Sequence, residues 1–91
     1  MAHYVYIIES LQDGSYYKGY SQDPLNRLMQ HNNAESKYTS GKMPWNLVYV
    51  EECTNKTEAL TRERNLKKAQ RDRIQSLLSH PKNIVGRFSV R

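Results

Sequence analysis

MAHYVYIIESLQDGSYYKGY, residues 1–20, is the stretch that decides the fold. Two runs rich in Tyr, Val and Ile lie on either side of residues 11–14, Leu-Gln-Asp-Gly. β-Branched and aromatic residues favour strands, and an Asp-Gly pair between two such runs is typical of a β-hairpin. The pattern therefore predicts two paired strands, at residues 3–9 and 15–20, with a short connection between them.

The hairpin brings two tyrosines into an unusual relation. Side chains alternate along a strand, so a connection with an even number of residues places Tyr6 and Tyr17 on one face of the sheet. Gly19 follows on that face and leaves room for another group to approach. Most tyrosines in strands only pack against their neighbours. The pair therefore predicts either a packed face or a site built from two phenols.

Composition narrows the class of protein. Ninety-one residues make one domain, and 14 Lys and Arg against 9 Asp and Glu give a net charge of +5. This charge favours a polyanionic partner such as nucleic acid, although many small basic domains bind no acidic partner. Seven of the nine aromatic residues are Tyr, which supplies hydroxyls and stacking faces.

Several classes of protein are excluded. The single Cys53 rules out an intramolecular disulfide and a zinc site made of cysteines alone. The N-terminus lacks the basic and apolar regions of a signal peptide, and no apolar run approaches the ~20 residues of a membrane span. We therefore expect a soluble, cytoplasmic protein.

The pattern after the hairpin predicts a first helix at residues 24–31. Asp23 is a suitable N-cap and Pro24 a suitable first helical residue. Arg27 and His31, four residues apart, lie together beside the apolar stripe of this helix. A helix C-terminus stabilises a protonated histidine, so His31 has a structural interpretation as well as a functional one.

The next segment, residues 32–45, is polar and is broken by glycine and proline. It carries Lys37, Tyr38 and Lys42, and interleaved basic and aromatic residues suit contacts with a nucleic-acid backbone and its bases. An ordinary solvated loop is the alternative. A third strand follows at residues 46–52, with Leu47, Val48 and Val50 in the core and Tyr49 on the face opposite Val48 and Val50.

A second helix begins at Asn55, which forms a capping box with Glu58. Glu63 lies on the same helical stripe as Ala59 and Leu66, where a carboxylate needs an explanation. It either projects into a site and holds a cation, or pairs with a basic residue, which could be Arg62, Arg64, Lys67 or an arginine across the fold.

A third helix is predicted at residues 71–79, where Arg71 and Arg73 add to the basic surface. The last segment comprises residues 81–91, in which we expect Ile84, Val85 and Phe88 to fold back on the core. The predicted fold class is α+β, with a small three-stranded antiparallel sheet flanked by about three helices.

Two tripeptides of the hairpin resemble a known signature. Residues 4–6, Tyr-Val-Tyr, ten intervening residues and residues 17–19, Tyr-Lys-Gly, resemble the motif of the GIY-YIG nuclease superfamily. The resemblance continues through Asn26-Arg27, Gln30-His31-Asn32 and Pro44-Trp45, and through Glu-Ala-x-x-x-Glu-x-x-Leu-Lys at residues 58–67. It covers residues 3–79 and is strongest to small stand-alone bacterial members. It implies a catalytic domain at residues 1–80 and a C-terminal tail at residues 81–91.

The resemblance also implies an activity and a site. The activity is metal-dependent hydrolysis of phosphodiester bonds in DNA, structure-directed and of use in repair, with Mg²⁺ or Mn²⁺ as cofactor. Tyr6 would be the general base, Tyr17 would position the phosphate or water, Arg27 would stabilise developing charge, and Glu63 would hold the metal. We expect further contacts with the nucleic acid from Lys18, His31, Lys37, Tyr38, Lys42 and Lys67.

Some residues depart from the family pattern. Glu9 stands where some members carry a basic residue, which weakens phosphate binding. A late asparagine of some members has no clear counterpart, since Asn83 does not align with it. The alternative functions are therefore a catalytically inactive module that binds nucleic acid, and a small protein whose basic surface serves a protein partner.

Overall fold

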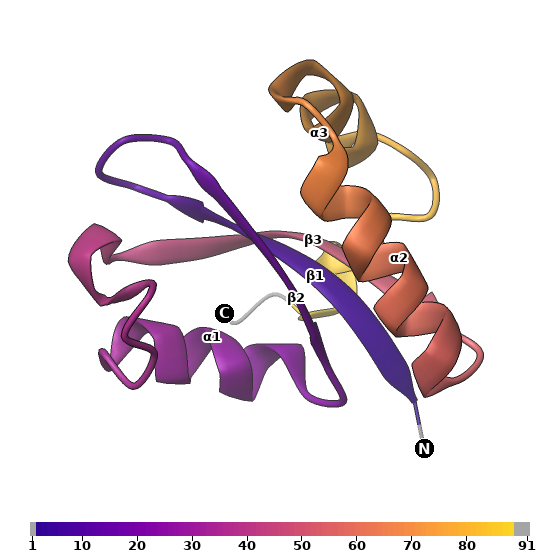
Figure 1. Cartoon of the computed structure of the whole chain (residues 1–91), viewed down its shortest axis with the longest axis horizontal. Coiled ribbons are helices and arrows are strands. Elements are labelled where there is room, and N and C mark those ends of the chain that lie inside the picture. Colours follow the sequence, from indigo (N-terminus) through magenta and orange to yellow (C-terminus); the bar gives the residue numbers. More distant parts are fainter. Residues whose placement is uncertain (1, 89–91) are drawn as a thin grey trace.

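The computed structural model describes residues 2–88 and shows a three-stranded antiparallel sheet with helices on both faces (Figure 1). In chain order the elements are β1 (His3–Ser10), β2 (Tyr16–Ser21), α1 (Pro24–Asn32), the 3₁₀ turn η1 (Ser40–Lys42), β3 (Trp45–Cys53), α2 (Lys56–Lys68), α3 (Arg71–Leu78) and the 3₁₀ turn η2 (Val85–Phe88). The strand order is β2-β1-β3, with β1 in the centre. The predicted fold class is confirmed.

The hairpin between β1 and β2 has the predicted facing of its tyrosines. Tyr6 pairs with Gly19 and Ile8 pairs with Tyr17, so Tyr6 and Tyr17 share one face of the sheet. Gly14 occupies the turn with φ +74°, a backbone conformation that glycine adopts without steric cost. Its amide donates to the carbonyl of Ser10 at 2.9 Å, which closes the turn.

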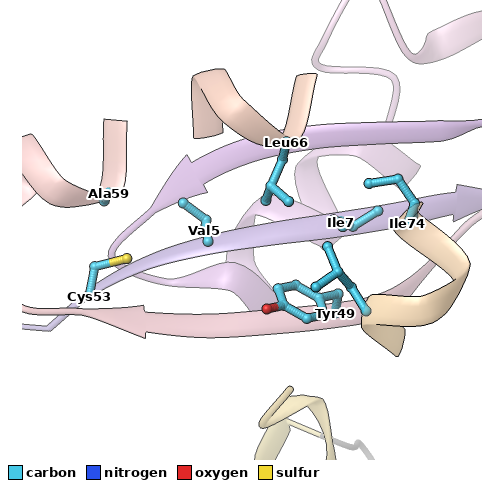
Figure 2. Close-up of a cluster of buried hydrophobic side chains, with 8 residues drawn as sticks. Val5, Ile7, Tyr49, Cys53, Ala59, Leu66 and Ile74 are labelled. Carbon is cyan, nitrogen blue, oxygen red and sulfur yellow. The ribbon is translucent and has the colours of Figure 1, made fainter. Parts of the chain in front are cut away.

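The sheet has a separate hydrophobic cluster on each face. The helices α2 and α3 cover one cluster (Figure 2), which comprises Val5, Ile7, Tyr49, Cys53, Ala59, Leu66, Ile74 and Leu77. On the other face, the buried members are Tyr6, Ile8, Trp45 and Val50. Leu28 of α1 packs against this second cluster, as does the C-terminal segment. The two tyrosines therefore lie on the face that α1 covers.

The prediction for the third strand is partly wrong. Ile7 pairs with Tyr49 and Ile8 pairs with Leu47, so Val48 is an extra residue in a β-bulge. A bulge interrupts the alternation of side chains. As a result, Val48 packs on the same side as Tyr49, and Tyr49 is fully buried, whereas Val50 lies on the opposite face as predicted.

Polar side chains cap the N-termini of two helices, α1 and α2, at the predicted positions. Asp23 accepts a hydrogen bond from the amide of Asn26 at 3.1 Å, and Pro24 opens α1. Asn55 accepts from the amide of Glu58 at 2.8 Å, and Glu58 accepts from the amide of Thr54 at 2.7 Å. These local bonds satisfy amides that have no partner within the helix.

An ion pair attaches α2 to β3. This attachment adds to the apolar packing of the helix, which buries only two of its 13 residues, Ala59 and Leu66. Arg62 Nε donates to Glu51 Oε1 at 3.1 Å, and the Tyr49 hydroxyl donates to the same oxygen at 2.6 Å. Burial, together with the bond to Glu51, raises the pKa of Tyr49 to about 12. The network holds α2 at a fixed rotation on the sheet.

The chain after α3 returns to the sheet, as predicted for Ile84, Val85 and Phe88, which pack against the cluster around Tyr6. Asn83 attaches this segment to the bulged edge of β3. Its side-chain amide donates to the carbonyls of Val48 and Leu78, and its oxygen accepts from the amides of Val50 and Val85. Residues 89–91 of the predicted tail lie outside the described residues. Within residues 2–88, every helix is too short or too polar to cross a membrane.

Candidate functional site

Tyr6 lies on the central strand with its ring across Gly19. A Cβ atom on Gly19 would stand 2.5 Å from the Tyr6 hydroxyl oxygen and 2.6 Å from Cζ, closer than real contacts allow. The space beside this glycine is therefore occupied by the Tyr6 ring, and not by a ligand as the sequence suggested. The Tyr6 side chain is almost completely enclosed, with 1% of the residue exposed.

The Tyr6 hydroxyl begins a buried chain of hydrogen bonds. It lies 2.9 Å from His31 Nε2, and His31 Nδ1 lies 2.8 Å from the hydroxyl oxygen of Thr39. Thr39 donates its own proton to the carbonyl of Ser36 at 3.4 Å, so it accepts from His31 Nδ1. The remaining nitrogen, Nε2, then accepts the proton of Tyr6.

The environment of His31 keeps its imidazole neutral. Burial, with a smaller contribution from the positive charge of Arg27, lowers the pKa of His31 to about 4. A neutral imidazole has one donor and one acceptor, which matches its two bonds to Thr39 and Tyr6. The prediction that His31 contacts nucleic acid is wrong for this conformation, because the residue is 0% exposed and both ring nitrogens face protein groups. Its place is behind Tyr6.

Tyr17 is the centre of an aromatic group on the same face. Its ring centroid lies 5.0 Å from that of His31, 5.7 Å from that of Tyr38 and 6.5 Å from that of Trp45. Tyr17 is half-buried, whereas Tyr38 projects from the loop with 81% of its surface exposed. The predicted loop tyrosine therefore stands directly beside the second tyrosine of the hairpin.

Arg27 and Glu63 lie on α1 and α2, two helices that cover opposite faces of the sheet. Burial raises the pKa of the Tyr6 phenol, the positive charge of Arg27 opposes this, and Tyr17 and Glu63 add to it. Arg27, Tyr17 and Glu63 thus each affect the protonation of Tyr6. Arg27 itself donates to Gln30 Oε1 at 2.5 Å, which directs its guanidinium along α1.

Glu63 has a neighbour of opposite charge, one of the two alternatives that the sequence left open. Lys67 Nζ lies 3.6 Å from the Glu63 carboxylate, one helical turn away, and the Glu63 side chain is 20% exposed. No group of three or more His, Cys, Asp and Glu side chains within residues 2–88 is placed to hold a metal ion. A lone, partly exposed carboxylate fits Mg²⁺, which takes one or two carboxylates and fills its other positions with water and phosphate oxygens.

A cleft of about 520 Å³ lies along β2 beside these residues. Its lining combines aromatic and basic side chains from β2, the loop and α2: Tyr16, Tyr17, Lys18, Tyr38 and Lys67. Burial lowers the pKa of Lys18. The cleft thus brings together Lys18, Tyr38 and Lys67, three of the residues predicted to contact nucleic acid.

Two other predicted contact residues lie elsewhere. Lys42 forms an ion pair with Asp13 at 3.4 Å and donates to Ser15, so its charge is partly neutralised at the tip of the hairpin. Lys37 is exposed in the loop next to Tyr38. Sequence reasoning missed Tyr16, which lines the cleft, and Thr39, which orients His31. Only their closeness to Tyr17 and Tyr38 in the chain pointed to them.

Comparison with known proteins places the chain in a group of similar size and fold. The model of the GIY-YIG catalytic domain matches residues 2–76. The UPF0213 protein SSP2268 of Staphylococcus saprophyticus is 42% identical over 78 residues, covering 85% of this chain and 94% of the relative. The UPF0213 protein VNG_2274C of Halobacterium salinarum is 40% identical over 76 residues, covering 82% and 97% respectively.

A solved structure shares the fold. The solution NMR structure of the UPF0213 protein BH0048 from Bacillus halodurans superposes with a TM-score of 0.58 at 34% identity, covering 98% of this chain and 95% of the other. The names of these relatives specify neither a reaction nor a substrate.

Proposed function

The chain belongs to the GIY-YIG catalytic-domain family, whose activity is generally that of a nuclease, and we propose that it is a metal-dependent endonuclease that hydrolyses phosphodiester bonds in DNA. The proposal is supported by a cleft lined by aromatic and basic side chains, and by the effect of a second phenol, a guanidinium and a carboxylate on the pKa of a buried phenol. Hydrolysis of a phosphodiester needs a positioned water, a charge clamp for the phosphate and a stabilised leaving group. The four side chains are Tyr6, Tyr17, Arg27 and Glu63.

Arg27 and Tyr17 bind the phosphate in this proposal. The guanidinium is planar and always charged, so it holds two phosphate oxygens and offsets the negative charge that develops during attack. Tyr17 lines the cleft and its hydroxyl donates to a phosphate oxygen or to the attacking water. Lys18 and Lys67, on the same walls, hold the neighbouring phosphates of the strand.

Tyr6 orients the attacking water in this proposal. The Tyr6 proton is directed to His31 Nε2, so the Tyr6 oxygen presents its lone pairs and accepts a hydrogen bond from water. As the water attacks phosphorus, this hydrogen bond directs its oxygen, the proton that the water loses passes to a phosphate oxygen, and the neutral His31 keeps the Tyr6 proton turned away from the water. Burial raises the pKa of Tyr6, and Arg27 is the group that counteracts this effect.

Glu63 would hold Mg²⁺ or Mn²⁺. The bound ion would neutralise charge on the leaving oxygen and the phosphate. Lys67, which pairs with Glu63, then turns its ammonium group to a phosphate in the cleft.

A second candidate is a module of the same fold that binds nucleic acid without cutting it. The burial of Tyr6 favours this alternative, because a water molecule must reach a hydroxyl that belongs to a residue only 1% exposed. The basic cleft and the exposed ring of Tyr38 suit binding in either case.

The test is a cleavage assay on branched, nicked and linear DNA with Mg²⁺, Mn²⁺ or EDTA. We expect metal-dependent cutting by the native protein and a loss of about 100-fold or more in Tyr6→Phe, Arg27→Ala and Glu63→Ala. Cutting that survives all three substitutions would come from a contaminating nuclease and would contradict the proposal. Binding without cutting would establish the second candidate instead.

A further inference from the structure

Arg71 is exposed, but two contacts hold its side chain in place. Its Nη1 donates to the carbonyl of Gly14 at 2.9 Å, and its guanidinium carbon lies 5.0 Å from the centroid of the Tyr16 ring. A guanidinium over a tyrosine face gains a cation–π attraction. The first residue of α3 is thus attached to the tip of the β1–β2 hairpin.

The position of Arg71 connects it to the cleft, because the ring that it covers lines the cleft wall. Tyr16 lines the cleft together with Lys18 and Lys67. Lys67 is in the last turn of α2 and Arg71 opens α3, on either side of the short connection at residues 69–70. Lys18, Lys67 and Arg71 therefore contribute positive charge to the cleft and to its margin at Tyr16.

We propose that Arg71 binds a backbone phosphate of the nucleic acid outside the cleft and so extends the path of the strand from Lys67 over Tyr16 to the hairpin tip. This inference rests on the proposed function, because it requires a nucleic-acid substrate. Arg71 acts as a positioning residue, because it holds the strand at a phosphate other than the reacting one.

The two contacts make Arg71 suitable for this role. A free arginine side chain has high rotamer entropy, and part of it is lost when the side chain is ordered. Arg71 is already ordered, so a phosphate contact requires less further ordering. A guanidinium has five N–H donors, and the bond to Gly14 engages one of them. The remaining donors match the oxygens of a phosphate.

Arg73 provides a matched control on the same helix. It is exposed and carries the same charge, but it lines a different cleft of about 740 Å³ whose walls include Glu51, Glu52 and Glu58. The three carboxylates offset the charge of Arg62, Lys82 and Arg87 on the same walls, and this cleft shares no lining residue with the cleft along β2. Loss of Arg73 therefore changes the net charge of the protein by the same amount without affecting the proposed path.

The test measures the salt dependence of binding to a fluorescein-labelled branched DNA by anisotropy, in EDTA, from 50 to 200 mM NaCl. We expect Arg71→Gln to lower the slope of log Kd against log salt by about 0.9. From 50 to 200 mM NaCl, the Kd of the native protein should therefore rise by a factor about three times larger than the Kd of the variant. Arg73→Gln should keep the native slope. Arg71→Lys, which retains the charge, should restore most of the difference.

The possible results distinguish a failure of the proposed function from a failure of the role of Arg71. A native protein that binds no DNA at 50 mM NaCl would overturn the proposed function and this inference with it. Native binding with equal slopes in Arg71→Gln and Arg73→Gln would overturn the role of Arg71 alone. A thermal melt of each variant separates the loss of the hairpin contact, which lowers Tm, from the loss of a phosphate contact, which changes the slope.

Discussion

Gly19 is the residue on which the position of Tyr6 depends. A Cβ atom there would overlap the Tyr6 ring at 2.5–2.9 Å, and the buried ring has little room to move. We expect Gly19→Ala to lower the free energy of unfolding by about 1–3 kcal/mol and to reduce cleavage by displacing the Tyr6 hydroxyl from His31. Urea denaturation and the cleavage assay measure the two effects.

Gly41 serves as the control for that substitution. A Cβ on Gly41 meets no atom within 4 Å, so Gly41→Ala should change stability by no more than about 0.5 kcal/mol. Equal stability of the Gly19→Ala and Gly41→Ala variants would show that the Tyr6 ring does not rest on Gly19.

His31 makes stability depend on pH. Its pKa of about 4 in the folded protein is below the ordinary value of 6.5, so between these pH values the unfolded chain binds a proton that the folded protein does not. The stabilisation is complete above pH 6.5 and is lost as the pH falls toward 4. Between pH 6.5 and 4.5, the native protein should lose about 2–3 kcal/mol more stability than His31→Gln.

Urea denaturation across this pH range is the measurement, and the comparison with His31→Gln removes the contribution of the carboxylates. Parallel stability curves for the two proteins would mean that the buried imidazole titrates normally.

Among single residues, those of the two tripeptides could be recognised in the sequence because they depend only on strand alternation and on a short turn. Thr39 could not, because its contact with His31 depends on the conformation of the irregular loop at residues 32–45. The burial of His31 follows from the same contact. A histidine on a polar stripe has the same sequence pattern whether solvent or a loop covers it.

At the scale of elements, Asn83 attaches the C-terminal segment to the edge of β3. We expect Asn83→Ala to lower the free energy of unfolding by about 2–3 kcal/mol, because the half-buried backbone groups of Val48, Val50 and Leu78 lose their partner. The exposed Asn46 of the same strand is the control, and Asn46→Ala should be nearly neutral. Urea denaturation that gave the two variants equal stability would contradict this role.

The start of each long helix could be predicted because Asp23 and Asn55 bond to amides three residues away. The bulge at Val48 could not, because it depends on how β3 pairs with a strand about 40 residues earlier. For the same reason, the burial of Tyr49 and its bond to Glu51 were not apparent in the sequence.

At the scale of the whole molecule, the proposed site draws its residues from three packed parts of the fold. The hairpin supplies Tyr6 and Tyr17, α1 supplies Arg27 from one face of the sheet, and α2 supplies Glu63 from the other. The sequence showed the residue types, but the face of the sheet on which each of them lies depends on the sheet order and on the packing of both helices. The net charge likewise did not show which lysines line the cleft. Lys42 pairs with Asp13, whereas Lys18 and Lys67 line the cleft.

The most direct test of the central claim, that these elements form one metal-dependent nuclease site, is single-turnover cleavage of a branched DNA with Mg²⁺ by the native protein, Glu63→Gln and Glu52→Gln. Each substitution removes one carboxylate charge, and Glu52 is exposed on β3 beside the other cleft. We expect cleavage by the native protein and Glu52→Gln, and a loss of about 100-fold or more in Glu63→Gln at unchanged DNA affinity. Equal cleavage by the two variants, or none by the native protein, would contradict it.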